Sequence, residues 1–200
     1  MKKLLIAIAT LTLVLAGCRE KAGQPQTETT GTAQVASETT TASATTTGES
    51  GGVVTNMTDD DKEFVSKAGM GGLAEVQMGN VALQKAQNAD VKAFAQRMVT
   101  DHSQANEELQ QLATTKGLAL PTELAGEHKD AMEHLSSLSG ADFDKQYMKH
   151  MVEDHEKDVA EFDKASTTAN DADVKTWAGK TLPTLRSHLE QAKTTSAKLK

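Results

Sequence analysis

The chain has 200 residues, a formal net charge of −7 at pH 7 and an aromatic content of only 3%. An acidic chain with so few aromatic residues lacks the basic surface and the stacking side chains that nucleic-acid binding uses, so no nucleic-acid partner is expected. The single cysteine excludes an intramolecular disulfide in any compartment. The fold must therefore be stabilised by packing.

Residues 1–17 have the pattern of a bacterial secretory signal peptide. Two lysines give a positive start, and residues 4–15 are apolar. This run is shorter than the roughly 20 apolar residues that span a bilayer. Residues 15–18 read Leu-Ala-Gly-Cys, which resembles the lipobox of bacterial lipoproteins, where cleavage leaves an acylated cysteine as the first residue. We therefore expect Cys18 to be lipidated; the alternative is an ordinary signal peptide followed by an incidental cysteine.

The residue after the cysteine bears on the destination of such an anchor. In Gram-negative lipoproteins an aspartate there usually marks retention at the inner membrane, and this chain has Arg19. We therefore expect a cell-envelope protein, an outer-membrane lipoprotein that faces the periplasm and has the membrane as a partner through its anchor.

Residues 18–57 are expected to form a disordered tether behind the lipidated cysteine. Thr, Ser, Ala, Gly, Gln and Glu dominate the segment, and no hydrophobic period runs through it. Such a composition cannot bury enough apolar surface to offset the entropy lost on ordering. The folded domain is therefore expected to begin at residue 58.

Residues 58–200 are expected to form one domain in which nearly every segment is helical. Thr58 followed by three aspartates is a typical helix start, and Gly117 is a typical helix end. Pro183 lies inside the last segment and is expected to kink it. No alternating pattern of strand residues competes. The predicted helices cover about residues 58–87, 88–116, 121–139, 141–168 and 170 onward.

The order of these helices predicts an all-α, ferritin-like antiparallel four-helix bundle. Tight turns join the first helix to the second and the fourth to the last, which gives two helical hairpins, and a crossover that carries the short third helix joins them. The halves also echo each other, because residues 89–95 and 172–178 share the pattern Ala-Asp-Val-Lys-x-x-Ala. The echo is interpreted either as duplication of the hairpin or as convergent helix-start chemistry.

Three histidines, His102, His155 and His188, occupy the middle of the apolar stripe on three different predicted helices. The first helix carries Glu75 at a comparable depth. Counting from the turns, Glu75 and His102 differ by about 3 Å along the bundle. His155 and His188 differ by about 6 Å. The spacing therefore permits the four groups to meet but does not force them together.

Imidazole and carboxylate groups are ligands of Zn, Fe, Mn and Cu, and a bundle core is a usual place for such a site. We therefore predict that these four residues bind a single transition-metal ion. Asp101 and Asp154 directly precede two of the histidines and are predicted to accept hydrogen bonds from imidazoles on adjacent helices, or else to be solvated surface acids. The alternative for the whole cluster is a hydrogen-bonded polar core without metal.

The spacing of the acids argues against a di-iron centre. Ferritin-like carboxylate sites use Glu-x-x-His on two helices, whereas the residue three before each core histidine is Val or Leu. A copper site is a further alternative, because Met148 and Met151 lie at helical spacing beside His150, although core packing explains the same methionines. His128 and His134, on the crossover, are predicted to be surface residues.

No other catalytic signature is present in the sequence. It lacks a nucleophile elbow, a phosphate loop, a dinucleotide fingerprint and a His-Glu-x-x-His motif. We therefore assign no catalytic residue and favour a protein that is not an enzyme.

Several motifs together resemble one family. They span residues 60–198 and make the chain similar to domain-of-unknown-function family 4142, exported bacterial proteins regarded as ferritin-like bundles and often labelled outer-membrane proteins. The resemblance implies the fold and an envelope location, while the biochemical activity of the family is not established. Its motif positions include the four core residues named above. The motifs are Leu-Ala-Glu at 73–75, the run from Val91 to His102, the run from Phe143 to His155, and Leu182-Pro183 followed by His188-Leu189.

Three hypotheses about function follow from the sequence. The leading one is a lipid-anchored envelope protein whose periplasmic bundle binds one metal ion in its core. The second is a ferritin-like redox or metal-storage enzyme, which needs an oxidisable metal with an open coordination position. The third is a structural or partner-binding envelope protein whose histidines only pack.

Overall fold

A computed structural model of the chain describes residues 57–199. The expected signal peptide, the lipidated Cys18 and all of the expected tether except Met57 lie outside the described residues. In the described part there are five helices and no strand. The helices are α1 (Asp59–Lys85), α2 (Ala89–Thr115), α3 (Gly126–Ser137), α4 (Gly140–Thr168) and α5 (Ala172–Lys198).

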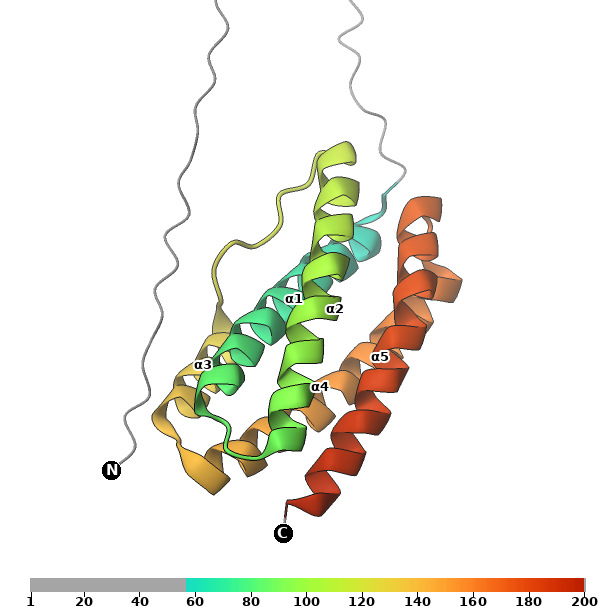
Figure 1. Cartoon of the computed structure of the whole chain (residues 1–200). Coiled ribbons are helices and arrows are strands. Elements are labelled where there is room, and N and C mark those ends of the chain that lie inside the picture. The colour runs from blue at the N-terminus through green and yellow to red at the C-terminus, as the bar shows by residue number, and fades with distance from the viewer. Residues whose placement is uncertain (1–56, 200) are drawn as a thin grey trace, which may run out of the picture. The chain divides into compact units, whose positions relative to one another are not determined.

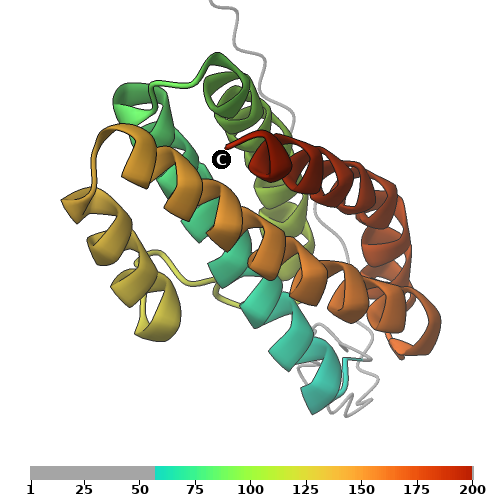
Figure 2. The same ribbon diagram turned by 90° about the horizontal axis from the view of Figure 1, so that it is seen from below.

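The helices form the predicted all-α, ferritin-like antiparallel four-helix bundle. Helices α1 and α2 form one antiparallel hairpin, and α4 and α5 form the other (Figure 1). The hairpins meet through contacts of α2 with α5 and of α1 with α4. Helix α3 belongs to the crossover and packs on the outside of α1 and α4, as the second view shows (Figure 2). Among the described helices, none is both long enough and apolar enough to cross a membrane.

The helix boundaries follow the capping residues closely, with one exception. The Thr58 hydroxyl accepts a hydrogen bond from the Asp61 backbone N–H, and the Asp61 carboxylate accepts one from the Thr58 N–H, which is a complete capping box. Asn88 and Asp171 each accept hydrogen bonds from two backbone N–H groups of the helix that follows. Helix α5 continues through Pro183.

The exception is the third helix, which was predicted to begin near residue 121. It begins at Gly126 instead. Leu120 and Pro121 pack against α1 at Gly69, where an added Cβ would lie 3.2 Å from Leu120 Cδ2. This contact holds the chain in an irregular conformation that the local sequence does not reveal.

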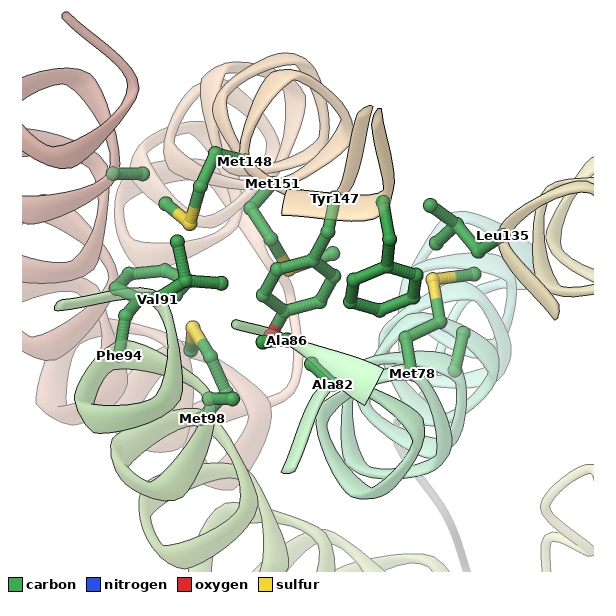
Figure 3. Close-up of a cluster of buried hydrophobic side chains, with 14 residues drawn as sticks. Met78, Ala82, Ala86, Val91, Phe94, Met98, Leu135, Tyr147, Met148 and Met151 are labelled. Carbon is green, nitrogen blue, oxygen red and sulfur yellow. The ribbon is translucent and has the colours of Figure 1, made fainter. Parts of the chain in front are cut away.

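The core consists of two apolar clusters, one at each end of the bundle. The cluster near the α1–α2 turn contains Phe94, Tyr147, Met148 and Met151 (Figure 3). The cluster near the α4–α5 turn is built around Phe162, Trp177 and Leu109. Between the two clusters lies a layer of buried polar side chains from all four long helices, namely Glu75, His102, His155 and His188.

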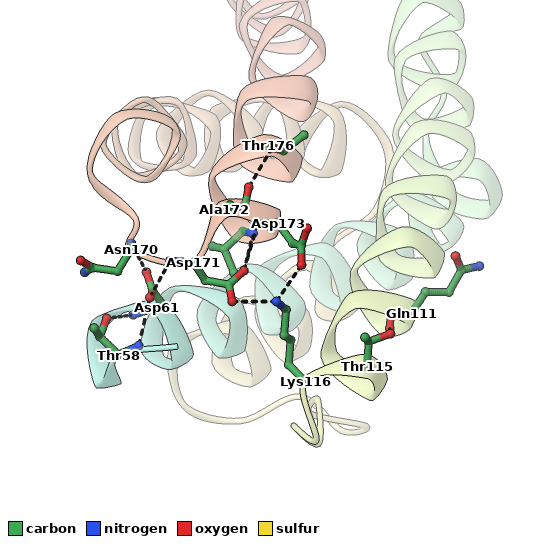
Figure 4. Close-up of polar contacts among 11 residues, drawn as sticks. Thr58, Asp61, Gln111, Thr115, Lys116, Asn170, Asp171, Ala172, Asp173 and Thr176 are labelled. Carbon is green, nitrogen blue, oxygen red and sulfur yellow. Dashed lines mark hydrogen bonds and ion pairs between the residues drawn. The ribbon is translucent and has the colours of Figure 1, made fainter. Parts of the chain in front are cut away.

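Two buried aspartates tie each hairpin to the turn of the other. Asp144, near the start of α4, accepts hydrogen bonds from the backbone N–H groups of Gln87 and Asn88 at 2.8–3.2 Å. Asp61, near the start of α1, accepts them from the N–H groups of residues 170 and 171 at 3.0 and 3.2 Å (Figure 4). Asp144 lies 83 positions after Asp61, and residues 170 and 171 lie 83 positions after Gln87 and Asn88. The two sets of contacts are therefore related by an approximate twofold symmetry that exchanges the hairpins.

Replacing Asp144 with alanine is expected to lower the free energy of unfolding by about 2 to 3 kcal/mol. The substitution leaves two backbone N–H groups of the α1–α2 turn without their charged acceptor. Urea unfolding followed by circular dichroism measures the loss. The matched control is Asp142→Ala, an exposed first-turn acid of the same helix, for which a change within about 0.5 kcal/mol is expected. Equal losses in the two variants would contradict the role of Asp144.

Candidate metal centre

The structure brings His102 of α2, His155 of α4 and His188 of α5 together in the middle of the bundle. Their ring centroids lie 5.2 to 5.6 Å from one another. One ring nitrogen from each histidine lies within 4.8 Å of the corresponding atoms of the other two. All three are buried, and His155 and His188 are 0% exposed. We call these three residues the histidine triad.

Each imidazole of the triad is held by one ring nitrogen. His102 Nδ1 lies 2.7 Å from Glu75 Oε2, and His188 Nε2 lies 2.8 Å from Asp101 Oδ2. His155 Nδ1 lies 2.9 Å from the carbonyl oxygen of Met151. Such contacts fix the orientation of an imidazole ring and its tautomer.

The other ring nitrogen of each imidazole has no hydrogen-bond partner within the described residues. These atoms are His102 Nε2, His155 Nε2 and His188 Nδ1, and all three are buried. A buried polar atom without a partner costs about 1 to 3 kcal/mol, and native proteins seldom contain three such atoms in one cluster of side chains. In each imidazole of the triad, one ring nitrogen contacts a protein oxygen that orients the ring, and the other remains available as a ligand. This is the arrangement of an ion-binding site.

Glu75 of α1 reaches the triad because α1 and α2 pack closely. Gly79 permits this approach, since a Cβ there would lie 2.8 Å from Val99 Cγ2. While Oε2 contacts His102, Oε1 lies 3.3 Å from His155 Nε2 and has no hydrogen-bond partner of its own. Glu75 therefore offers one carboxylate oxygen to the triad and uses the other to orient an imidazole.

Asp158 of α4 belongs to the same polar layer, although the sequence analysis did not identify it. Atoms of Asp158, Glu75 and His155 lie within 4.8 Å of one another. Two signals in the sequence point to it. Asp158 follows His155 by one helical turn, in the order opposite to Glu-x-x-His, and it lies 83 positions after Glu75, the offset of the internal repeat.

The predicted residues beside the triad differ in their outcomes. Asp101 contacts an imidazole on an adjacent helix, as expected. Asp154 is buried, but its Oδ2 has no partner among the described residues, so it does not orient a triad imidazole in the same way. Met148 and Met151 pack in the apolar cluster near the α1–α2 turn. This is the core-packing role that the sequence analysis gave as the alternative to a copper site. His134 is exposed, whereas His128 is half-buried and its expected surface position is only partly correct.

Burial keeps the imidazoles neutral at pH 7. It lowers the pKa of His102 to about 4, and that of His188 to about 4 despite the opposing hydrogen bond to Asp101. Burial also lowers the pKa of His155 well below its ordinary value, and the neighbouring imidazoles act in the same direction. Neutral imidazole is the form that binds a metal ion.

The two acids of the layer shift in the opposite sense. Burial and the charge of Asp154 raise the pKa of Glu75 well above its ordinary value. Burial and the charges of Glu75 and Asp154 raise the pKa of Asp158. Anionic charge is therefore disfavoured in the layer unless a cation compensates it.

The sequence matches the family described as a domain of unknown function, DUF4142, over residues 50–195. No curated protein matches the chain significantly. Among solved structures, a DUF305 fragment from Deinococcus radiodurans is similar, with a TM-score of 0.63 and 15% identity over 71% of this chain and 98% of that chain. A candidate secreted DUF305 protein from Streptomyces coelicolor has a TM-score of 0.60 and 14% identity over 70% of this chain and 93% of that one.

A further structural neighbour is CopM in its Cu(II)-bound form. Its TM-score is 0.60, with 16% identity over 70% of this chain and 97% of the CopM chain. At this level of identity the likeness concerns the fold. The neighbours therefore support the helical bundle, and one of them binds copper.

The free energy of unfolding of the metal-free protein is expected to depend on pH through the triad. Below about pH 6.5 the unfolded chain binds protons on its histidines, whereas a folded imidazole with a pKa of about 4 does not. Stability contributed by these residues is therefore lost as the pH falls from about 6.5 towards 4. For His188 the expected loss between pH 7 and pH 5 is about 2 kcal/mol.

Urea unfolding of the metal-free wild type and of His188→Leu at pH 7 and pH 5 measures this difference. The wild type is expected to lose about 2 kcal/mol more than the variant over that interval. The comparison with a variant is needed because the raised pKa values of Glu75 and Asp158 act in the opposite direction, favouring the fold as the pH falls. Identical losses in both proteins would show that His188 protonates as readily in the folded state as in the unfolded chain.

Proposed function

The chain belongs to the DUF4142 family, whose function is unknown, and on this premise we propose that it binds one transition-metal ion in the core of its bundle. The observation that carries the proposal is the convergence of three buried imidazoles, each of which offers one ring nitrogen within 4.8 Å of the others. Each imidazole also has one buried ring nitrogen without a hydrogen-bond partner among the described residues, namely His102 Nε2, His155 Nε2 and His188 Nδ1. A metal ion is the ligand that uses three such lone pairs at once.

The surroundings of the triad support a cation rather than a neutral ligand or water alone. Neutral imidazoles donate lone pairs, and the two adjacent carboxyl groups are acids whose charged form a cation would stabilise. The fourth ligand in this proposal is Glu75 through Oε1, the oxygen that has no hydrogen-bond partner. Asp101 and the carbonyl of Met151 hold two of the imidazoles in place.

The donor set restricts the identity of the ion. Three imidazoles and one carboxylate suit Zn, Cu, Fe or Mn, whereas Ca and Mg prefer oxygen ligands throughout. Copper gains support because CopM, which shares the fold, is a copper-bound protein. Met98 and Met151 lie one turn before His102 and His155, so thioether groups border the layer on its apolar side.

The burial of the triad favours metal binding over metal-dependent catalysis. A groove of about 180 Å³ between α2 and α5 reaches Asp101, the outer partner of His188. It is not lined by the imidazoles themselves. A redox enzyme of the ferritin-like type needs a coordination position that a substrate can reach. The groove ends at Asp101 and does not reach the imidazole of His188.

The cellular setting in this proposal is the envelope. The signal-like residues 1–17, the lipobox-like sequence before Cys18 and the presence of Arg19 support an outer-membrane lipoprotein whose bundle faces the periplasm. A tether of residues 18–57 would separate the bundle from the acylated cysteine. Stable anchoring by lipid needs more than one acyl chain.

The metal proposal predicts one tightly held ion per chain. The protein is reconstituted in turn with Zn²⁺, Cu²⁺, Fe²⁺ and Mn²⁺, desalted and analysed for metal content. At least one metal is expected to remain at one ion per chain in the wild type and to be lost from the His102→Leu/His188→Leu double variant. At a free concentration 100 times the dissociation constant, that metal is expected to stabilise the wild type by about 2.7 kcal/mol.

The matched control for the metal experiment is His134→Leu, because His134 is exposed and lies outside the triad. It is expected to retain the ion as the wild type does. A wild type that retains no ion under any of the four conditions, or a double variant with unchanged metal content, would refute the proposal and leave a purely structural polar core.

The anchor predicts that Cys18→Ser abolishes acylation and releases the protein from the membrane fraction. Mass spectrometry of the mature amino terminus and fractionation of the envelope measure the two effects. Substitution of Ser37, in the tether, serves as the control and is expected to change neither. Unchanged membrane partitioning of Cys18→Ser would contradict the lipoprotein assignment.

A further inference from the structure

A second group of metal-ligating side chains lies outside the triad, between α3 and α4. His128 Nδ1, His150 Nε2 and Asp154 Oδ2 are all buried and all lack a hydrogen-bond partner in the part of the chain that the structure describes. Asp154 as a whole is only 7% exposed. None of these three atoms belongs to the triad. The sequence analysis gave Asp154 a role beside the triad, placed His150 in the copper alternative and predicted a surface position for His128.

The geometry of the α3–α4 hairpin places these side chains at matching depth. His128 and His150 each lie 11 residues from Ser139, which caps α4 at the turn, so they meet at the same level of two antiparallel helices. Asp154 follows His150 by one helical turn and therefore lies on the same face of α4. An ion pair of 3.7 Å between Lys157 and Glu127 joins the two helices beside this level.

The electrostatics of this group favour a cation. Burial lowers the pKa of His150, which keeps its imidazole neutral, and the neighbouring His128 imidazole acts in the same direction, while the charge of Asp154 opposes the shift. The charges of Glu153 and Lys157 act on the pKa of His150 in opposite directions. Two imidazole nitrogens and a carboxylate oxygen, all buried and without hydrogen-bond partners among the described residues, are donor atoms that a transition-metal cation can use.

We propose that His128, His150 and Asp154 form a second site for a divalent transition-metal ion, at the interface of α3 and α4. The ligands are His128 Nδ1, His150 Nε2 and Asp154 Oδ2, a set of two imidazoles and one carboxylate that suits Zn²⁺, Cu²⁺ or Co²⁺ and leaves a position for water. We call it the outer site.

The outer site differs from the triad in how it is organised. Within residues 57–199, the ligand groups whose atoms all lie within 4.8 Å of one another are the triad and the set of Glu75, His155 and Asp158. The outer site is not among these compact groups, so in this proposal the half-buried His128 and His150 side chains rotate to bring their ring nitrogens onto the ion. Its affinity is expected to be lower than that of the triad, because closing restricts two side chains.

The two sites adjoin each other along α4 without sharing a ligand. His150, Asp154 and Asp158 lie on successive turns of one face of the helix, and Asp158 contacts the layer through Glu75 and His155. The charge of Asp154 acts on Glu75 and His102 as well as on His150. An ion at the outer site would therefore lie beside the polar layer, on the side of the bundle that helix α3 covers.

Equilibrium titration of the full mature chain with Zn²⁺ separates the two sites, with the absorption of Co²⁺ as a second probe of imidazole coordination. The wild type is expected to bind two ions. The His102→Leu/His188→Leu variant is expected to bind one ion, at the outer site. Adding His128→Gln to that variant is expected to weaken the remaining affinity by about tenfold or more. His134→Gln, an exposed histidine of the same helix α3, is the matched control and should leave both ions in place.

Asp154→Asn provides an independent test that keeps the volume of the buried side chain. It is expected to weaken the outer site by a similar factor, while circular dichroism verifies that the variant is folded. Unchanged Zn²⁺ affinity in both the His128→Gln and the Asp154→Asn variants, measured in the background without the triad, would overturn the outer site.

The pattern of losses tells the two proposals apart. If the wild type binds one ion and the His102→Leu/His188→Leu variant binds none, the outer site is refuted and the core site stands. If that variant binds Zn²⁺ as the wild type does and loses it with His128→Gln, the core proposal is refuted and the outer site stands. A wild type that binds no Zn²⁺ and no Co²⁺ refutes both.

Discussion

The structure depends on the way in which two buried aspartates join the hairpins. Asp61 and Asp144 each satisfy two backbone N–H groups in the turn of the opposite hairpin. These groups would otherwise lie at helix ends without acceptors. Because the contacts fix the turn of one hairpin against the helix start of the other, they set the relative depth of all four long helices. The buried polar layer can form only if that depth is right.

The polar layer is costly unless something compensates it. Four ionisable side chains from four helices lie between two apolar clusters, and four of their nitrogen and oxygen atoms have no partner among the described residues. A core of the same volume made of apolar residues would avoid this cost. The outer contacts to Asp101 and to the Met151 carbonyl orient two of the rings rather than satisfy the inner atoms. That division of roles is the physical basis for proposing a metal ion at the centre.

The internal repeat explains part of the layer. The offset of 83 residues relates Asp61 to Asp144 and Glu75 to Asp158, so the joining aspartates and the central acids follow the twofold symmetry of the hairpins. The histidines do not follow it, since the position equivalent to His155 is Gly72. A Cβ at Gly72 would lie 2.0 Å from Asn106 Oδ1, so that space is filled by a side chain from α2. Acids therefore occur at equivalent positions in both hairpins, whereas the histidines of the triad have no equivalent histidines in the other hairpin.

The sequence by itself determined the helices, the hairpin order and the inward faces of Glu75 and the three histidines, because helical periodicity and capping residues are local properties. It left the offset between His155 and His188 at about 6 Å, and it missed Asp158 and the late start of α3. Only the tertiary structure brought the imidazole rings of His155 and His188 to a centroid distance of 5.4 Å. Convergence depends on the mutual depth and rotation of four helices, which contacts between residues distant in sequence decide.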